Sequence, residues 1–264
     1  MQHACIPVSP NGASLKLPSD LVRPGSEAAS LFCPEDGKFP FGSKEAYLHP
    51  RILTILENLG MSSNDLSWQE VAERVESIYV LNALDNEAAR ERVKAMINFM
   101  ERKLQSGHLA PGSEVCIRIK VARFLPFLQK PANFPLTWKG DHLATNSLLS
   151  PKEICPEEHK YLVCCTEPVI GMAISQNVRE LLNCHLKSVR VQHVIKQLQN
   201  AMSVRPESLT RPQFEELDCV CTKVYVTLQQ FLQFHGADII RPIQGKSFIL
   251  LGRSFVSPTQ VAFT

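Results

Sequence analysis

The sequence predicts an α+β protein that is predominantly helical, built from two tandem modules that each combine a strand and a turn with three helices. Three observations predict this fold class. Apolar residues recur at helical spacing in several segments, short apolar segments bounded by proline or glycine lie between the helical blocks, and one local turn pattern occurs three times. Apolar residues make up 44% of the 264 residues, which is enough for a packed core. We expect modules at residues 1–110 and 111–243, and the start of a third module at residues 244–264.

The first module should contain three helices. One lies within residues 49–61, a second begins after Ser67, and a third runs from Asp85 to near Gly107. Ser67 and Glu70 have the spacing of a capping box, and Asp85 is a favoured N-cap residue. The apolar stripes of the three helices are Ile52, Leu53, Leu56 and Leu59; Trp68, Val71, Ala72, Val75 and Ile78; and Ala89, Val93, Met96, Ile97, Met100 and Leu104.

The second module repeats this plan, with helices at residues 175–186 and 189–202 and a long helix that Thr210 caps and Gly236 ends. The long helix has an apolar stripe at alternating spacings of three and four residues. The stripe could face a coiled-coil partner, but it spans less than three heptads, so we favour burial within its own module. Its residues are Phe214, Leu217, Cys221, Val224, Leu228 and Phe231.

Short strands are expected at residues 5–8, 123–128 and 247–251, where apolar residues are bounded by glycine or proline. Prolines within the first two indicate edge positions, because proline cannot donate a ladder hydrogen bond. Residues 105–113 have the glycine and proline content of a linker between the third helix and a following strand segment.

A local pattern follows each strand after a polar turn: proline, a polar residue, then Asp, Glu or Gln, then an aliphatic residue. The prolines are Pro18, Pro151 and Pro258. Proline fixes its own φ and disfavours helix at the residue before it, so the pattern predicts a short turn that places one aliphatic side chain in the core. One copy carries little information, but three copies in this order indicate two full modules and the opening of a third.

Charge and cysteine usage exclude several classes of protein. The formal net charge is +2, from 28 basic and 26 acidic residues, which argues against a nucleic-acid or membrane surface. The nine cysteines are odd in number and irregular in spacing, and no signal peptide or apolar span is evident, so we expect reduced thiols and a cytoplasmic setting.

Candidate chemistry is sparse, and we expect no catalytic residue, no metal ligand and no cofactor. Gly245-Lys246-Ser247 lacks the earlier glycine of a phosphate loop and precedes an apolar strand, which favours a turn. A zinc site or a nucleophilic cysteine would have to use residues 155–185, or Cys116 with His108. The spacing is wrong for tetrahedral zinc, and buried free cysteine is the favoured interpretation. The possible participants in the 155–185 cluster are His159, Cys164, Cys165, Cys184 and His185.

Several segments resemble the long internal repeats of the sacsin family of very large co-chaperones. They are Phe124-Leu125-Pro126, Pro135 to Asp141, Leu149 to Glu153, Gly252 with Phe255 to Phe263, Phe39-Pro40, Ile52 to Met61, and Ser67 to Val71. The family strand before Gly252 tends to carry tryptophan, and this chain has none there. The family's ATP-binding loops and its J-domain His-Pro-Asp are absent, since His49-Pro50 is followed by Arg51.

The resemblance implies a structural role: a non-catalytic scaffold or interaction segment in protein quality control, with heat-shock chaperones among the partners of the parent protein. Two alternatives stay open. One is a thiol- or metal-dependent hydrolase that uses the 155–185 cluster, and the other is a truncated ATP-coupled chaperone domain.

Overall fold

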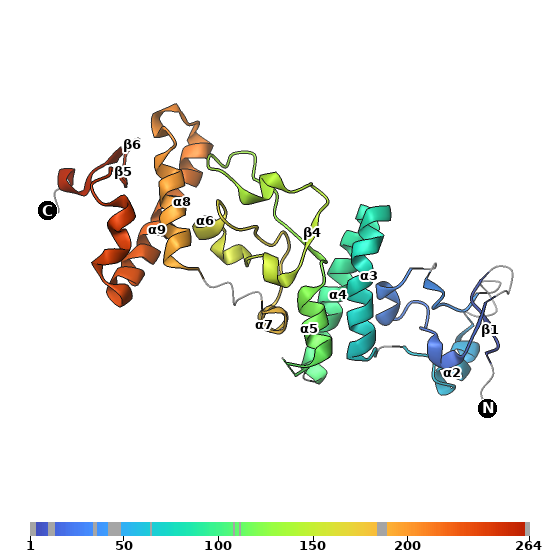
Figure 1. Cartoon of the computed structure of the whole chain (residues 1–264). Coiled ribbons are helices and arrows are strands. Elements are labelled where there is room, and N and C mark those ends of the chain that lie inside the picture. Colours follow the sequence, from blue (N-terminus) through green and yellow to red (C-terminus); the bar gives the residue numbers. More distant parts are fainter. Residues whose placement is uncertain are drawn as a thin grey trace. The chain divides into compact units, whose positions relative to one another are not determined.

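The computed structural model describes residues 4–9, 14–33, 36–41, 49–63, 65–107, 109–110, 112–183 and 189–261 (Figure 1). Helices dominate this part of the chain, and its strands form three short antiparallel pairs. The predicted α+β class with a predominance of helices is therefore confirmed. Of the helices in the described ranges, none combines the length and the apolar character that crossing a bilayer requires.

Contacts divide the chain into two compact units. Unit 1 is Met1–Phe124 with Ile174–Leu182, and unit 2 is Leu125–Ala173 with Asn183–Thr264. The chain therefore leaves unit 1 and returns to it for one short helix. The predicted module borders, near residues 110 and 243, concern fragments that fold on their own, and they stay a prediction.

Unit 1 begins with a hairpin and continues with helices. Its elements are β1 (Ile6–Pro7), β2 (Leu15–Lys16), α2 (Pro50–Asn58), α3 (Trp68–Leu84), α4 (Asn86–Ser106), α5 (Glu114–Val121) and α7 (Gln176–Leu182). Helices α3 and α4 pack side by side, and α7 packs on α4 and α5. The predicted stripes of α3 and α4 are largely buried, with Val75 and Met96 fully enclosed.

The predicted caps set the ends of α3 and α4. The Ser67 hydroxyl accepts from the Glu70 N–H at 3.2 Å, and the Glu70 carboxylate accepts from the Ser67 N–H at 2.8 Å. Asp85 ends α3 and also caps α4, since its carboxylate accepts from the N–H groups of Glu87 and Ala88, both at 3.0 Å. These bonds satisfy backbone donors that a helix start leaves unpaired.

Helix α5 was not predicted, and it lies between the expected linker at residues 105–113 and the expected strand at residues 123–128. The Ser113 hydroxyl accepts from the Cys116 N–H at 3.3 Å and so caps the helix. Cys116 and Ile119 are fully buried. Arg118 makes a two-pronged ion pair with Glu76 of α3, at 2.8 and 2.7 Å. The cap and the contacts with α3 and α7 therefore outweigh the strand propensity of the β-branched residues in this segment.

Unit 2 contains two hairpins and a helical pair. Its elements are β3 (Leu125–Pro126) paired with β4 (Leu148–Leu149), α6 (Lys160–Val163), α8 (Val191–Met202), α9 (Arg211–His235), and β5 (Ile249–Leu251) paired with β6 (Ser254–Val256). Thr210 is the N-cap residue of α9, where its N–H donates to the Gln213 side chain at 3.0 Å, and Gly236 ends the helix at a φ of 75°. A left-handed φ of this kind favours glycine at the end of a helix.

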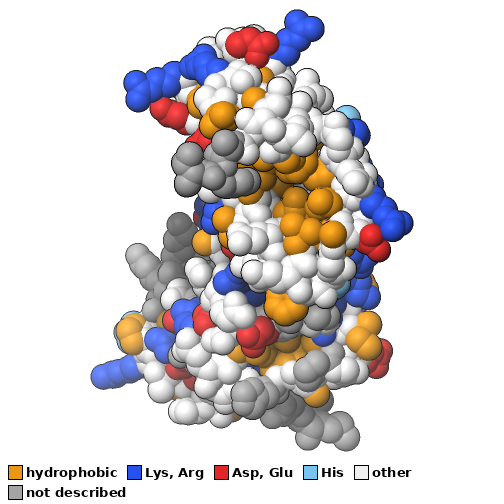
Figure 2. Space-filling model, turned by 90° about the vertical axis from the view of Figure 1, so that its left-hand side faces the viewer, with side chains coloured by type: hydrophobic (Ala, Val, Ile, Leu, Met, Phe, Trp, Pro, Cys, Tyr) orange, Lys and Arg blue, Asp and Glu red, His pale blue; other side chains and the backbone are white. Residues whose placement is uncertain are grey.

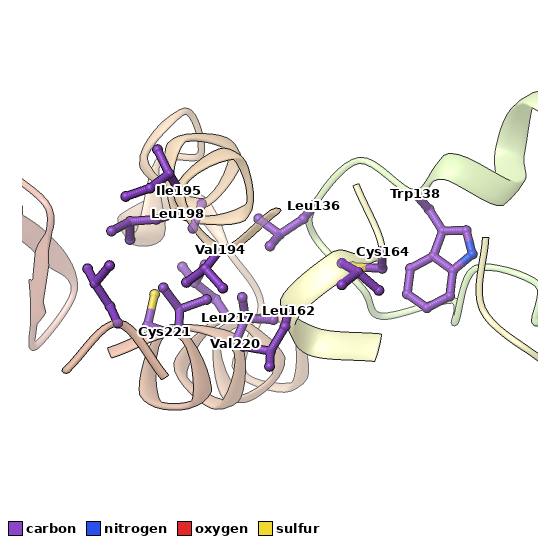
Figure 3. Packing of buried hydrophobic residues seen from close by; sticks show 14 of the residues in the cluster. Leu136, Trp138, Leu162, Cys164, Val194, Ile195, Leu198, Leu217, Val220 and Cys221 are labelled. Atoms are coloured by element: carbon purple, nitrogen blue, oxygen red, sulfur yellow. The ribbon is translucent and has the colours of Figure 1, made fainter. Parts of the chain in front are cut away.

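The core of unit 2 lies between α6, α8 and α9 (Figure 3). In Figure 3, Val194 and Leu198 of α8 point toward α9, and Leu136 and Cys164 lie on the side of Trp138. Leu217 and Val224 of α9 are both fully enclosed. The predicted burial of the α9 stripe within its own unit is therefore confirmed, and the coiled-coil alternative is wrong for these residues.

Candidate functional site

Within the 155–185 cluster, Cys164 and Cys165 form a packing joint between α6 and α8. Cys164 ends α6 and is fully buried. Gln197 of α8, also fully buried, donates through Nε2 to the Cys164 sulfur at 3.2 Å, and its Oε1 accepts from the Cys165 N–H at 3.2 Å. The Cys164 carbonyl accepts from the Lys139 N–H at 2.6 Å. One amide side chain thus fixes the end of α6 to the middle of α8.

Burial keeps the thiols of this cluster protonated. It raises the pKa of the Cys164 thiol to about 12 and that of the Cys165 thiol to about 11. The hydrogen bonds from Gln197 and Asn200 oppose the shift but do not cancel it. Catalytic cysteines have a lowered pKa, because the thiolate is the nucleophile. These two thiols therefore lack the property that a thiol hydrolase needs.

No metal-binding group forms where the chain is described: in that part, no three His, Cys, Asp or Glu side chains come close enough together to hold an ion. Cys184, His185 and His108 lie outside the described residues, so the absence of zinc stays a prediction. Two other histidines act as helix caps. The His193 ring accepts from the Arg190 N–H at 3.2 Å, and the His49 ring from the Arg51 N–H at 3.3 Å.

The Gly245-Lys246-Ser247 segment is a turn that enters a strand, as predicted. Gly245 has a φ of 76°, and β5 follows at Ile249. A phosphate loop requires a helix directly after the serine, so that its N–H groups face the phosphates. The geometry lacks this feature.

An open groove of about 530 Å³ lies beside the cysteine joint, on the exposed side of α8. Two lysines, Lys139 and Lys196, contribute positive charge, and no carboxylate lines it. The lining residues are Thr137, Lys139, Cys165, Thr166, Lys196, Gln199 and Asn200. The groove offers hydrogen bonds and positive charge, but no activated nucleophile and no acid–base pair.

The most regular feature of the chain is the repeated element, which we define as a β-hairpin followed by a proline-led 3₁₀ helix. The three copies are β1–β2 with Pro18–Asp20, β3–β4 with Pro151–Glu153, and β5–β6 with Pro258–Gln260. In each copy the side chain of the third helical residue accepts from the N–H before the proline. The distances are 3.3 Å for Asp20, 2.9 Å for Glu153 and 2.9 Å for Gln260.

These bonds give the sequence pattern its physical reason. The acid or amide must stand two residues after the proline, because only there does its side chain reach back to the free N–H. The hairpins follow the same register, since the strand residue two positions before each proline pairs with Ile6, Leu125 and Ile249 respectively. The predicted repetition of the turn is therefore confirmed by geometry.

Sequence reasoning missed a third part of the first two copies, which we call the return segment. Residues 38–41 in unit 1 and 168–171 in unit 2 each bridge the first strand and the residue after the turn. The Phe41 N–H donates to the Pro7 carbonyl at 2.7 Å, and the Gly171 N–H to the Pro126 carbonyl at 2.9 Å. The two segments share no obvious sequence beyond a proline and apolar residues, so no sequence pattern predicts them.

The other end of each return segment is tied in the same way. The Val22 N–H donates to the Lys38 carbonyl at 2.8 Å, and the Cys155 N–H to the Pro168 carbonyl at 2.9 Å. In unit 2 the fit is close, because a Cβ on Gly171 would lie 2.7 Å from the Phe127 backbone. The two complete copies thus share both strand register and clamping bonds.

The described residues thus contain a hairpin, turn and return segment in two complete copies, together with buried cysteines that pack the core of unit 2. No protein-family model and no solved structure matches the chain. It is 32% identical to human sacsin over 268 aligned residues, which cover 98% of this chain and 6% of the length of sacsin. The chain is a sacsin-like segment, as the resemblance predicted.

Proposed function

We propose that this chain is a non-catalytic scaffold and interaction segment of a sacsin-like co-chaperone that works in cytoplasmic protein quality control. The observation that carries the proposal is the repeated element. In each of its three copies a side chain accepts a hydrogen bond from the backbone N–H before the proline and so fixes the turn. The cysteine cluster adds support, because its thiols pack the core and have raised pKa values. A segment that covers 6% of its relative suits a part that spaces and presents surfaces within a larger chain.

Direct binding to a ninety-kilodalton heat-shock chaperone tests the proposal. The whole chain is immobilised, and binding of the purified chaperone is followed by surface plasmon resonance with and without ATP. We expect saturable binding to the folded chain. The Cys164→Ala variant should bind equally well, because no thiol chemistry is involved. Failure to bind the folded chain would remove the proposed partner.

Two activity measurements address the alternatives. Hydrolysis of activated esters and peptides by the wild-type chain should equal that of the Cys164→Ala variant. A rate that the substitution abolishes would support a hydrolase instead. Magnesium-ATP at millimolar concentration should leave the melting temperature unchanged, because ligand at about 100 times its dissociation constant adds about 2.7 kcal/mol and would be seen easily. A shift that Lys246→Ala removes would support nucleotide binding.

A further inference from the structure

The groove beside the cysteine joint carries positive charge that the described chain does not balance. Lys139 and Lys196 line it, both are exposed, and no carboxylate is among the described residues of its wall. Within the described ranges neither lysine forms an ion pair. Burial raises the pKa of the Cys165 thiol, and the positive charge of Lys196 opposes that rise, so the ammonium group lies close to the wall of the groove. Two positive charges therefore face one open hollow.

A second hollow of about 370 Å³, which we call the apolar pocket, adjoins this groove on α8. Lys196 and Gln199 line both hollows. Asp238 and Arg241 at the rim of the apolar pocket pair with each other at 3.0 Å, so Lys196 is the charge there that stays unbalanced. The apolar walls come from α8 and from the 3₁₀ helix Ala237–Ile243, and they are Val191, Ile195, Ile239 and Pro242.

Basic and apolar side chains occur together on a larger scale too. Figure 2 looks onto the side on which β5 and β6 lie in Figure 1, and hydrophobic side chains gather there while Lys and Arg side chains project from the margins. A ligand that suits such a surface carries both a negative group and an apolar group.

We propose that the groove and the apolar pocket together are a docking site for a phosphorylated polypeptide segment. A phosphoserine of the partner faces Lys139 and Lys196, and a nearby aliphatic side chain of the partner enters the apolar pocket. This inference goes beyond the scaffold role and does not depend on which chaperone the chain binds.

Charge decides between a phosphate and a carboxylate as the negative group. A phosphate monoester carries about −1.5 to −2 charges at pH 7, which matches the two lysines of the groove, whereas a carboxylate balances only one of them. Lysine is a common phosphate ligand in proteins, and the exposed hydroxyl of Thr137 adds a hydrogen-bond donor on the same wall. The groove therefore favours a phosphorylated side chain over an acidic one.

The positions of the two hollows on α8 predict the spacing of the two partner side chains. The α8 residues of the apolar pocket lie within 191–199, and those of the groove within 196–200, so the hollows are about one helical turn apart, roughly 5.4 Å along the axis. In an extended peptide, side chains on the same face are two residues apart, roughly 6.6 Å. One residue should therefore separate the phosphoserine from the aliphatic residue.

The probe is a fluorescein-labelled peptide, Gly-Leu-Gly-phosphoserine-Gly-Leu-Gly, which offers leucine at this spacing in either chain direction. Fluorescence anisotropy measures its binding to the full chain. We expect saturable binding, and binding at least about tenfold weaker for the same peptide with serine, with aspartate in place of the phosphoserine, or with glycine in place of both leucines. These comparisons use the unchanged protein, so they need no variant that must fold.

Two protein variants locate the site. Lys196→Gln removes the charge that both hollows share and should weaken binding of the phosphopeptide at least about tenfold. Lys223→Gln removes an exposed lysine of α9 that lines neither hollow and should leave binding unchanged. Absence of binding to the wild-type chain up to about 1 mM, or equal binding of the phosphorylated peptide and any of its three controls, overturns the proposal. So does an equal loss of binding in the two variants.

Discussion

In unit 1 the pair α3–α4 is tied to its neighbours by ion pairs, whereas in unit 2 the pair α8–α9 is tied mainly by buried neutral groups. Arg118 of α5 binds Glu76 of α3. In unit 2 the contacts are made by Gln197 of α8, which binds Cys164 and Cys165 at the end of α6, and by Tyr225 of α9, which binds the third hairpin. Both units contain the same hairpin and turn, which are held by backbone hydrogen bonds. The side chains outside these elements differ, and they form ion pairs in unit 1 and neutral hydrogen bonds in unit 2.

This difference predicts that the two units respond differently to mutation and to pH. Each unit contains one of the chain's two tryptophans, Trp68 in unit 1 and Trp138 in unit 2. Single-tryptophan variants, Trp138→Phe and Trp68→Phe, therefore report urea unfolding of one unit at a time.

The largest effect is expected from the core of unit 2. Leu217→Ala removes a fully buried side chain and should lower the free energy of unfolding by about 2–5 kcal/mol, through lost burial and a cavity. The Trp138 transition should move to lower urea while the Trp68 transition stays in place. Val226→Ala on the same helix, at a side chain that is 53% exposed, should change stability by less than about 0.5 kcal/mol. An equal shift of both transitions would show that the units unfold as one.

The next effect tests the neutral joint. Gln197→Ala leaves the partly buried Cys165 N–H without its acceptor, which should cost about 1–3 kcal/mol in the Trp138 transition. Gln192→Ala, on the exposed face of α8, is the matched control and should be nearly neutral. If the two variants were equally stable, Gln197 would not be the joint between α6 and α8.

Alkaline pH should weaken unit 2 first. Burial raises the pKa of Cys164 to about 12, so the folded state keeps the thiol protonated while the unfolded state ionises near 9. The resulting stability is fully present below about pH 9. It is lost as the pH rises toward the pKa of the folded state, by about 1.4 kcal/mol for each pH unit. Urea midpoints between pH 8 and about pH 10, under reducing conditions, measure this loss. It should be smaller in Cys164→Ala and unchanged in Cys219→Ala, where the side chain is exposed.

Acid pH should lower the free energy of unfolding of unit 1, and this is the smallest of the four predicted effects. The hydrogen bond from Arg118 holds the pKa of Glu76 below its usual value, despite some desolvation. The stability that this bond gives is present above the unfolded pKa, near 4.5, and is lost as the pH falls through the lower folded value. The Trp68 transition should therefore lose stability on acidification, and less so in Glu76→Gln than in the control Glu91→Gln. Identical acid profiles for these two variants would assign the acid response to other carboxylates.

The sequence predicted the parts of the fold that depend on local bonds. Ser67 with Glu70, and Asp85, form the expected caps, because each satisfies backbone donors within four residues, and Thr210 takes the expected N-cap position of α9. The proline turns were found for the same reason. Bonds between residues that are close in the sequence require particular residue types at fixed spacings, so the sequence predicts them.

Features that depend on distant residues were missed. Helix α5 was not predicted, since the sequence analysis placed a linker at residues 105–113 and a strand at residues 123–128. Its helical state rests on Ser113 and on contacts with α3 and α7. The return segments bind through main-chain groups, so their side chains carry little signal. The helix predicted at residues 175–186 forms as α7, yet it packs in unit 1 and not with the rest of the expected second module. Periodicity shows that a helix has a buried face, but not what covers that face.

The path of α7 has a consequence for synthesis on the ribosome. Residues up to Phe124 can collapse as they emerge, but unit 1 lacks the helix that meets Cys116 until Leu182 has been made. At roughly 5–20 residues per second, the intervening stretch takes several seconds to translate. During that interval the side chains of α4 and α5 that α7 contacts in the folded unit lack this helix, and transiently exposed apolar surface of this kind favours aggregation.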